Sequence, residues 1–179
     1  MAGFYISLWL KWAIRVSICS IVSAFGLSFL IMLVIYFNQG MPTLESEVLK
    51  ALFDITMFWF AIVWSLTLLV SLFRSLKYIF NSCNRTYKLQ LLRCDSAEFI
   101  EPIGYGDLVK VWRKWFMLII WLVGVQMVLS TAFSYLFLDA VGVFSWFNIY
   151  WLYTFILISG YFSFILLSNR CTRVKVVKC

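Results

Sequence analysis

The chain of 179 residues contains no histidine. This absence excludes haem sites with two histidine ligands, the usual zinc sites and acid–base catalysis by imidazole. Carboxylates are also few, and no two of them fall inside one apolar segment, where a catalytic or proton-relay pair would be needed. Walker and dinucleotide glycine loops are missing too. We therefore expect a protein that is not an enzyme and that uses no cofactor and no metal ion.

Charge of either sign is scarce. Charged residues make up 13% of the chain and hydrophobic residues 64%, with a mean hydropathy of +0.94. Soluble domains average about a quarter charged residues. A globule of this length has too large a surface for its volume to hide so much apolar area. Lipid must therefore be the solvent for much of the chain.

Four apolar segments are long enough to cross a bilayer, since roughly 20 helical residues span a hydrocarbon core of about 30 Å. They are residues 16–37, 51–73, 115–138 and 146–169. Their continuous apolar character indicates helices, because the strands of membrane barrels alternate and are shorter. We predict an all-α membrane protein in which residues 1–179 form one domain. Its four helices make two antiparallel hairpins, joined by a basic loop over residues 74–114.

Basic residues predict the orientation, because they concentrate on the cytoplasmic side. If both termini are cytoplasmic, Lys50 is the single basic residue of the 15 that lies outside. The net charge of +7 then follows from topology and from attraction to anionic headgroups of the inner leaflet, with no nucleic-acid partner. A phenylalanine-rich chain without histidine is typical of a bacterial inner (plasma) membrane. An endoplasmic-reticulum location with the same topology would give the same pattern.

The cysteines agree with this orientation. None of them has the CxxC spacing of redox proteins, and four of the 5 fall on the predicted cytoplasmic side, where thiols stay reduced. Those four are Cys83, Cys94, Cys171 and Cys179, while Cys19 lies within the first span. We therefore expect free thiols.

Small residues recur at helical spacing on two of the spans, and such rows let helix backbones approach closely in lipid. The rows are Ser20, Ala24 and Ser28 on the first span and Ser159, Gly160 and Ser163 on the fourth. We interpret them as packing surfaces, either within the chain or between copies of it. The aromatic residues before the first span are interpreted as an interfacial belt; they are Phe4, Tyr5, Trp9 and Trp12.

The third span carries a polar stripe of Gln126, Ser130 and Ser134, spaced by four. A glutamine amide in mid-bilayer is costly unless it is hydrogen-bonded. The stripe must therefore face protein or water. Three interpretations remain open: interhelical bonding within the bundle, an interface with another subunit, or the lining of a polar path.

The outer turn before the second span resembles a helix start, with Thr43 as the N-cap and Glu45 and Glu47 in the first turn. Lys50 and Asp54 follow at i, i+4. An ionisable residue inside a span is a candidate functional site. These two residues are therefore assigned either to an ion pair or to transport.

The central loop is too short for a domain of its own, so we expect it to lie on the membrane surface or on a partner. Residues 87–93 form a short amphipathic stretch and residues 95–107 are expected to be irregular. The run from Ile103 to Asp107 resembles the selectivity-filter signature of potassium channels. Glu101 and Pro102 stand where that family has threonines, and the segment is predicted to be cytoplasmic. The filter function is therefore not assigned to it.

Two functions follow from these observations. The first is a non-catalytic subunit that scaffolds, stabilises or tethers a larger membrane complex, with other membrane proteins or further copies of itself as partners. The second is an ion or small-solute channel or transporter formed by homo-oligomerisation. The sequence does not name the process in which the protein takes part.

Overall fold

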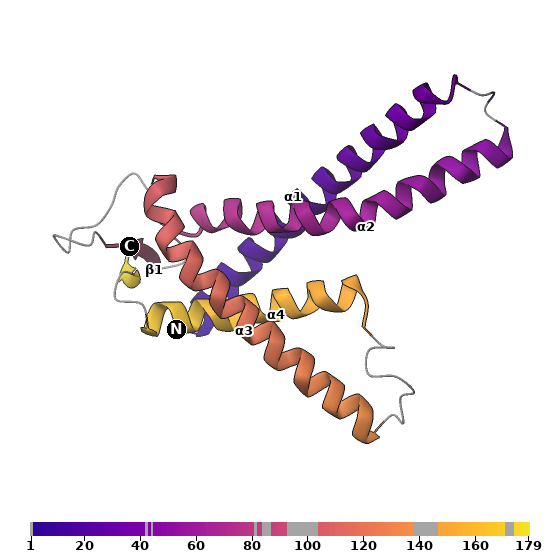
Figure 1. Cartoon of the computed structure of the whole chain (residues 1–179). Helices are drawn as coiled ribbons and strands as arrows, with labels where there is room; N and C mark the ends of the chain where they lie inside the picture. The colour runs from indigo at the N-terminus through magenta and orange to yellow at the C-terminus, as the bar shows by residue number, and fades with distance from the viewer. Residues whose placement is uncertain are drawn as a thin grey trace. The chain divides into compact units, whose positions relative to one another are not determined.

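The computed structural model describes residues 2–41, 43, 45–80, 82–83, 87–92, 104–137, 147–170 and 174–179. Within them are four long helices, drawn in Figure 1. They are α1 (Ala2–Asn38), α2 (Ser46–Lys77), α3 (Tyr105–Phe137) and α4 (Ile149–Arg170). All four are long and apolar enough to cross a membrane. The prediction of a multi-pass membrane protein is confirmed at this level.

Three of the helices are longer than a bilayer requires. α1 has 37 residues, which at about 1.5 Å per residue is roughly 55 Å, against about 30 Å of hydrocarbon. α1 also includes the aromatic segment before the first predicted span. α2 has 32 residues and α3 has 33, whereas the 22 residues of α4 match the core thickness closely.

α2 begins later than predicted. Gly40 and Met41 turn the chain with positive φ angles of 79° and 53°. The Glu45 N–H then donates to the Thr43 carbonyl, and the Glu45 carbonyl accepts the N–H of Leu49. Because Glu45 takes part in this turn, it precedes the helix, and the prediction of Thr43 as N-cap is wrong.

The filter-like run lies at the start of α3. The Gly104 carbonyl accepts the N–H of Leu108, so Gly104 precedes the helix and Tyr105 is its first residue. Residues 105–107 are therefore helical, in contrast to the predicted irregular segment, while residues 95–103 lie outside the described residues. The ring of Tyr105 contacts Lys77 at the end of α2, with Nζ 4.4 Å from the ring centroid.

α4 starts at a polar cap. The Asn148 side-chain oxygen accepts the N–H groups of Tyr150 at 3.0 Å and Trp151 at 3.1 Å. Asparagine is among the best residues for this position because its oxygen satisfies amides that have no partner inside the helix.

Two short strands correct the all-α prediction. β1 (Tyr87–Leu91) and β2 (Val174–Lys178) pair antiparallel, with Tyr87 opposite Lys178 and Leu91 opposite Val174. An isolated bridge also joins Phe80 to Leu89. β1 alternates apolar with polar residues, which is the pattern of a half-buried strand, whereas β2 breaks the alternation at Val176 and Val177. The stretch predicted as amphipathic is thus extended over residues 87–91.

The described residues form two compact units. One contains residues 1–13 and 76–179, and the other contains residues 14–75. In the following, the first is called the terminal unit and the second the α1–α2 unit.

Candidate functional site

The small face of α4 receives a tryptophan. Ser159 and Ser163 are fully buried, and a Cβ atom added to Gly160 would overlap ring carbons Cζ3 and Cη2 of Trp12. The sequence predicted close packing at this face but not its partner. Because Gly160 has no side chain, an aromatic ring from α1 can lie directly against the backbone of α4.

Trp12 belongs to a cluster of three buried rings in the terminal unit. Its ring centroid is 5.8 Å from that of Trp115 and 5.4 Å from that of Phe164, both at 86°. Trp115 and Phe164 stack at 5.9 Å and 18°. Edge-to-face pairs of this kind contribute about 0.5–1.5 kcal/mol beyond their buried area. The cluster therefore fastens α1, α3 and α4 together at one level.

The beginning of α1 continues this contact along α4. Tyr5 and Ser168 share a hydrogen bond of 2.7 Å, and the Trp9 indole donates to the Leu157 carbonyl at 2.8 Å. Phe4 meets the ring of Tyr87 edge-on at 5.9 Å. The residues predicted to form an interfacial belt thus bind helix α4 and strand β1.

The Gln126 amide is hydrogen-bonded inside the chain. Its nitrogen donates to the hydroxyl of Ser159 at 2.6 Å and to the Phe155 carbonyl at 3.3 Å, both on α4. It also lies 3.2 Å from the Leu122 carbonyl of its own helix. Of the other two stripe residues, Ser134 is buried and Ser130 is half-buried. The geometry of Gln126 is that of a bond between two helices.

The row of small residues on α1 is buried in the α1–α2 unit. Ser20, Ala24 and Ser28 each have no exposed surface. Ser20 accepts the indole N–H of Trp64 at 3.3 Å, and its carbonyl accepts the hydroxyl of Thr67 at 3.2 Å. Ser28 differs, because its buried hydroxyl has no hydrogen-bond partner among the described residues.

The buried side chains of α1 extend this row in a regular way. Apart from Tyr5 and Ala13, they recur every fourth residue from the first turn onward, at Phe4, Leu8, Trp12, Val16, Ser20, Ala24 and Ser28. Four residues turn a helix by about 400°, so such a row rotates by about 40° at each step. This period could have been found in the sequence by extending the small-residue row backward.

Lys50 and Asp54 lie on the exposed side of α2. Both residues are described, and the structure joins them by neither a hydrogen bond nor an ion pair. Their assignment to an ion pair or to transport stays a prediction.

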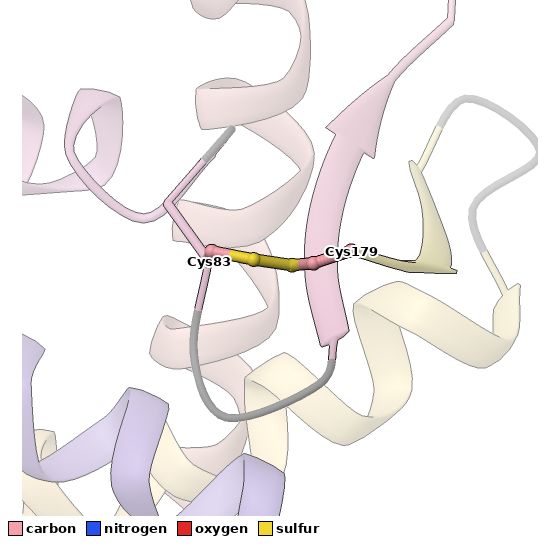
Figure 2. Close-up of a disulfide and its surroundings, with 2 residues drawn as sticks. All are labelled: Cys83 and Cys179. Atoms are coloured by element: carbon pink, nitrogen blue, oxygen red, sulfur yellow. A yellow bond between two sulfur atoms is a disulfide. The ribbon is translucent and has the colours of Figure 1, made fainter.

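The strand pair carries a disulfide between Cys83 and Cys179, shown in Figure 2. The two Cα atoms are 6.3 Å apart, within the range that a disulfide bridges. The expectation of free thiols is therefore wrong for these two residues. It was based on the compartment, whereas the fold brings Cys83, four residues before β1, close to Cys179, directly after β2. Cys19 is free and exposed, and Cys94 and Cys171 lie outside the described residues.

In the part of the chain that the structure describes, no three His, Cys, Asp or Glu side chains lie close enough together to hold a metal ion. Comparison with protein-family models, with curated proteins and with solved structures found no match.

Proposed function

We propose that the protein is a non-catalytic integral membrane subunit that scaffolds, stabilises or tethers a larger membrane complex. The hydrogen bonds of Gln126 to α4 carry this proposal. In the sequence, Gln126 belongs to the stripe that could line a polar path. In the structure, its amide bonds α3 to α4. A glutamine amide that bonds two helices of one chain stabilises the packing of those helices, which a structural subunit requires.

Contacts inside the terminal unit support a topology with both termini on one side. Phe4 near the amino terminus packs on Tyr87 of β1, and β1 pairs with β2 at the carboxyl terminus. Both ends of the chain therefore meet at one small sheet. The distribution of basic residues assigns this side to the cytoplasm.

The contacts between α3 and α4 support an antiparallel hairpin. Trp115 stacks on Phe164, whereas Gln126, further along α3, bonds Ser159, which comes earlier in α4. The contacts thus run in opposite directions along the two helices, which supports this part of the proposal.

The outer half of α3 supplies a surface for neighbouring proteins. Tyr135, Leu136 and Val128 are 76%, 71% and 69% exposed. These residues lie on a helix of membrane-spanning length, so lipid or a partner helix must cover them. Large exposed apolar faces of this kind are used for helix association in the bilayer.

Gentle extraction into polymer-bounded lipid discs, followed by mass measurement, tests the proposal. Co-purification with other polypeptides at a fixed ratio is the expected result. A lone monomer would contradict it. A homo-oligomer that conducts ions or solutes in liposomes would favour the channel function instead.

Gln126→Leu separates the two functions further. In a structural subunit this change lowers the yield of the assembled complex, because the bond between α3 and α4 is lost. In a channel lined by the stripe, it abolishes flux while the assembly stays intact. Asp54→Asn is a suitable control for the subunit function, because Asp54 is exposed and its replacement should leave the yield unchanged.

A further inference from the structure

A groove of mixed character lies between α3 and α4 in the terminal unit. Its volume is about 380 Å³. It is lined by Arg113, Lys114, Met117, Leu118 and Trp121 of α3, and by Leu166 and Leu167 of α4. Charge is thus confined to one end, and the remaining lining is apolar.

The charged end is built by consecutive residues of α3. Arg113 and Lys114 are both exposed, and Lys110 lies one turn earlier on the same face. Neither Arg113 nor Lys114 forms an ion pair with any residue whose side chain the structure describes. Their long aliphatic stems can lie along the groove while the charged ends reach water or a headgroup.

The apolar part of the groove lining lies further along α3, toward its carboxyl end. Met117 and Trp121 come four and eight residues after Arg113, so the lining extends roughly 6 and 12 Å beyond the charge. Trp121 is 74% exposed, and on a membrane-spanning helix its ring faces the acyl region. The Leu167 side chain is buried and forms part of the α4 wall.

We propose that this groove binds an anionic phospholipid, with the phosphate at Arg113 and Lys114 and an acyl chain against Met117, Leu118 and Trp121. Cationic pockets between membrane helices recognise lipid headgroups in this way. The complementarity has two parts, charge at the rim and about 12 Å of apolar wall. A soluble anion would use the rim alone, and an acidic peptide would leave its polar backbone against the apolar wall.

The test is native mass spectrometry of the full chain in a neutral detergent, titrated with phosphatidylglycerol and separately with phosphatidylcholine. One phosphatidylglycerol should be retained per chain, at least tenfold more tightly than phosphatidylcholine. Each groove charge should contribute about fivefold in affinity. Arg113→Gln together with Lys114→Gln should therefore weaken binding by about 25-fold.

The matched control is Lys175→Gln together with Lys178→Gln. It removes the same charge from exposed residues of β2, away from the groove lining, and should change the affinity by less than twofold. An equal loss in both double variants would show diffuse attraction and overturn the proposal. Equal binding of the two lipids would overturn it as well.

The apolar wall is tested independently of charge. Trp121→Ala should weaken phosphatidylglycerol binding several-fold, whereas Tyr135→Ala, at an equally exposed position of α3, should leave it unchanged. Both replacements are at exposed positions and leave the buried core intact. Competition by soluble glycerol phosphate at the same concentration as the lipid would assign the site to an anion alone and refute the lipid proposal.

Discussion

The contact between Gly160 and Trp12 predicts that a single added methyl group will destabilise the terminal unit. In Gly160→Ala the new Cβ would overlap ring carbons of Trp12. The indole cannot swing aside freely, because it is 2% exposed and is held edge-on by Trp115 and Phe164. The helix of Gly160 must then shift, or the aromatic cluster must open.

The expected magnitude follows from two opposing terms. Overpacking a filled core costs about 1–3 kcal/mol, and the rigid surroundings of Trp12 place this site near the upper end. Replacing glycine by alanine inside a helix returns about 1 kcal/mol. Gly160→Ala should therefore lower the free energy of unfolding by about 2 kcal/mol.

Gly124→Ala is the matched control. Gly124 is exposed in the middle of α3, and no atom lies within 4 Å of its added Cβ. Gly124→Ala gains the same helix propensity as Gly160→Ala but creates no overlap with a neighbouring side chain. Its free energy of unfolding should therefore be unchanged or up to about 1 kcal/mol higher.

Reversible unfolding in mixed micelles of neutral detergent and SDS, followed by circular dichroism, measures both variants. The reasoning is refuted if Gly160→Ala is as stable as Gly124→Ala. Trp12→Phe supplies a second check, because phenylalanine lacks the ring carbons that the methyl group would meet. In the Gly160→Ala background it should recover part of the loss, giving a coupling free energy above about 0.5 kcal/mol.

Three further predictions use the same unfolding assay or thiol chemistry. Gln126→Leu and Ser159→Ala should be coupled by about 0.6–1.7 kcal/mol, because they break one shared bond; additive effects would contradict the geometry. Ser20→Ala should cost about 1 kcal/mol, because its hydroxyl accepts an indole N–H. Ser28→Ala, equally buried but without a partner, should be neutral or stabilising, and equal effects would argue against these assignments. In a variant whose only cysteines are Cys83 and Cys179, purified without reductant, maleimide should label the thiols only after the disulfide has been reduced. When Cys83→Ser is added to this variant, maleimide should label Cys179 without prior reduction.

The membrane helices could be predicted because their cause is local. A run of about 20 apolar residues bounded by charge is enough to specify a spanning helix. Burial of Ser20 and Gly160 could also be anticipated, since small residues mark close approach. Their partners could not, because a row of small residues is equally compatible with another small row or with a large ring such as Trp12. The start of α2 was misplaced because Thr43 is a good cap by residue type, whereas in the structure its carbonyl accepts the N–H of Glu45 in a turn that precedes the helix.

The strand pair was missed for a different reason. β1 and β2 have five residues each and are separated by two long helices, and neither is stable as a strand without the other. β1 has an alternating sequence pattern and β2 only part of one, and such a pattern says nothing about pairing across such a distance. The disulfide was excluded on the basis of compartment, which constrains redox state but not geometry.

The disulfide and the charge distribution describe different properties and can both hold. The strand register places Lys178 opposite Tyr87, so Cys179 lies just beyond the end of the ladder. Cys83 lies four residues before Tyr87, the first residue of β1. In the structure these two Cα atoms lie 6.3 Å apart and the sulfur atoms are joined. The disulfide thus adds a covalent link to the ladder and to the contact of Phe4 with Tyr87, and together they hold the two ends of the terminal unit. The sheet is thus the element that unites the termini.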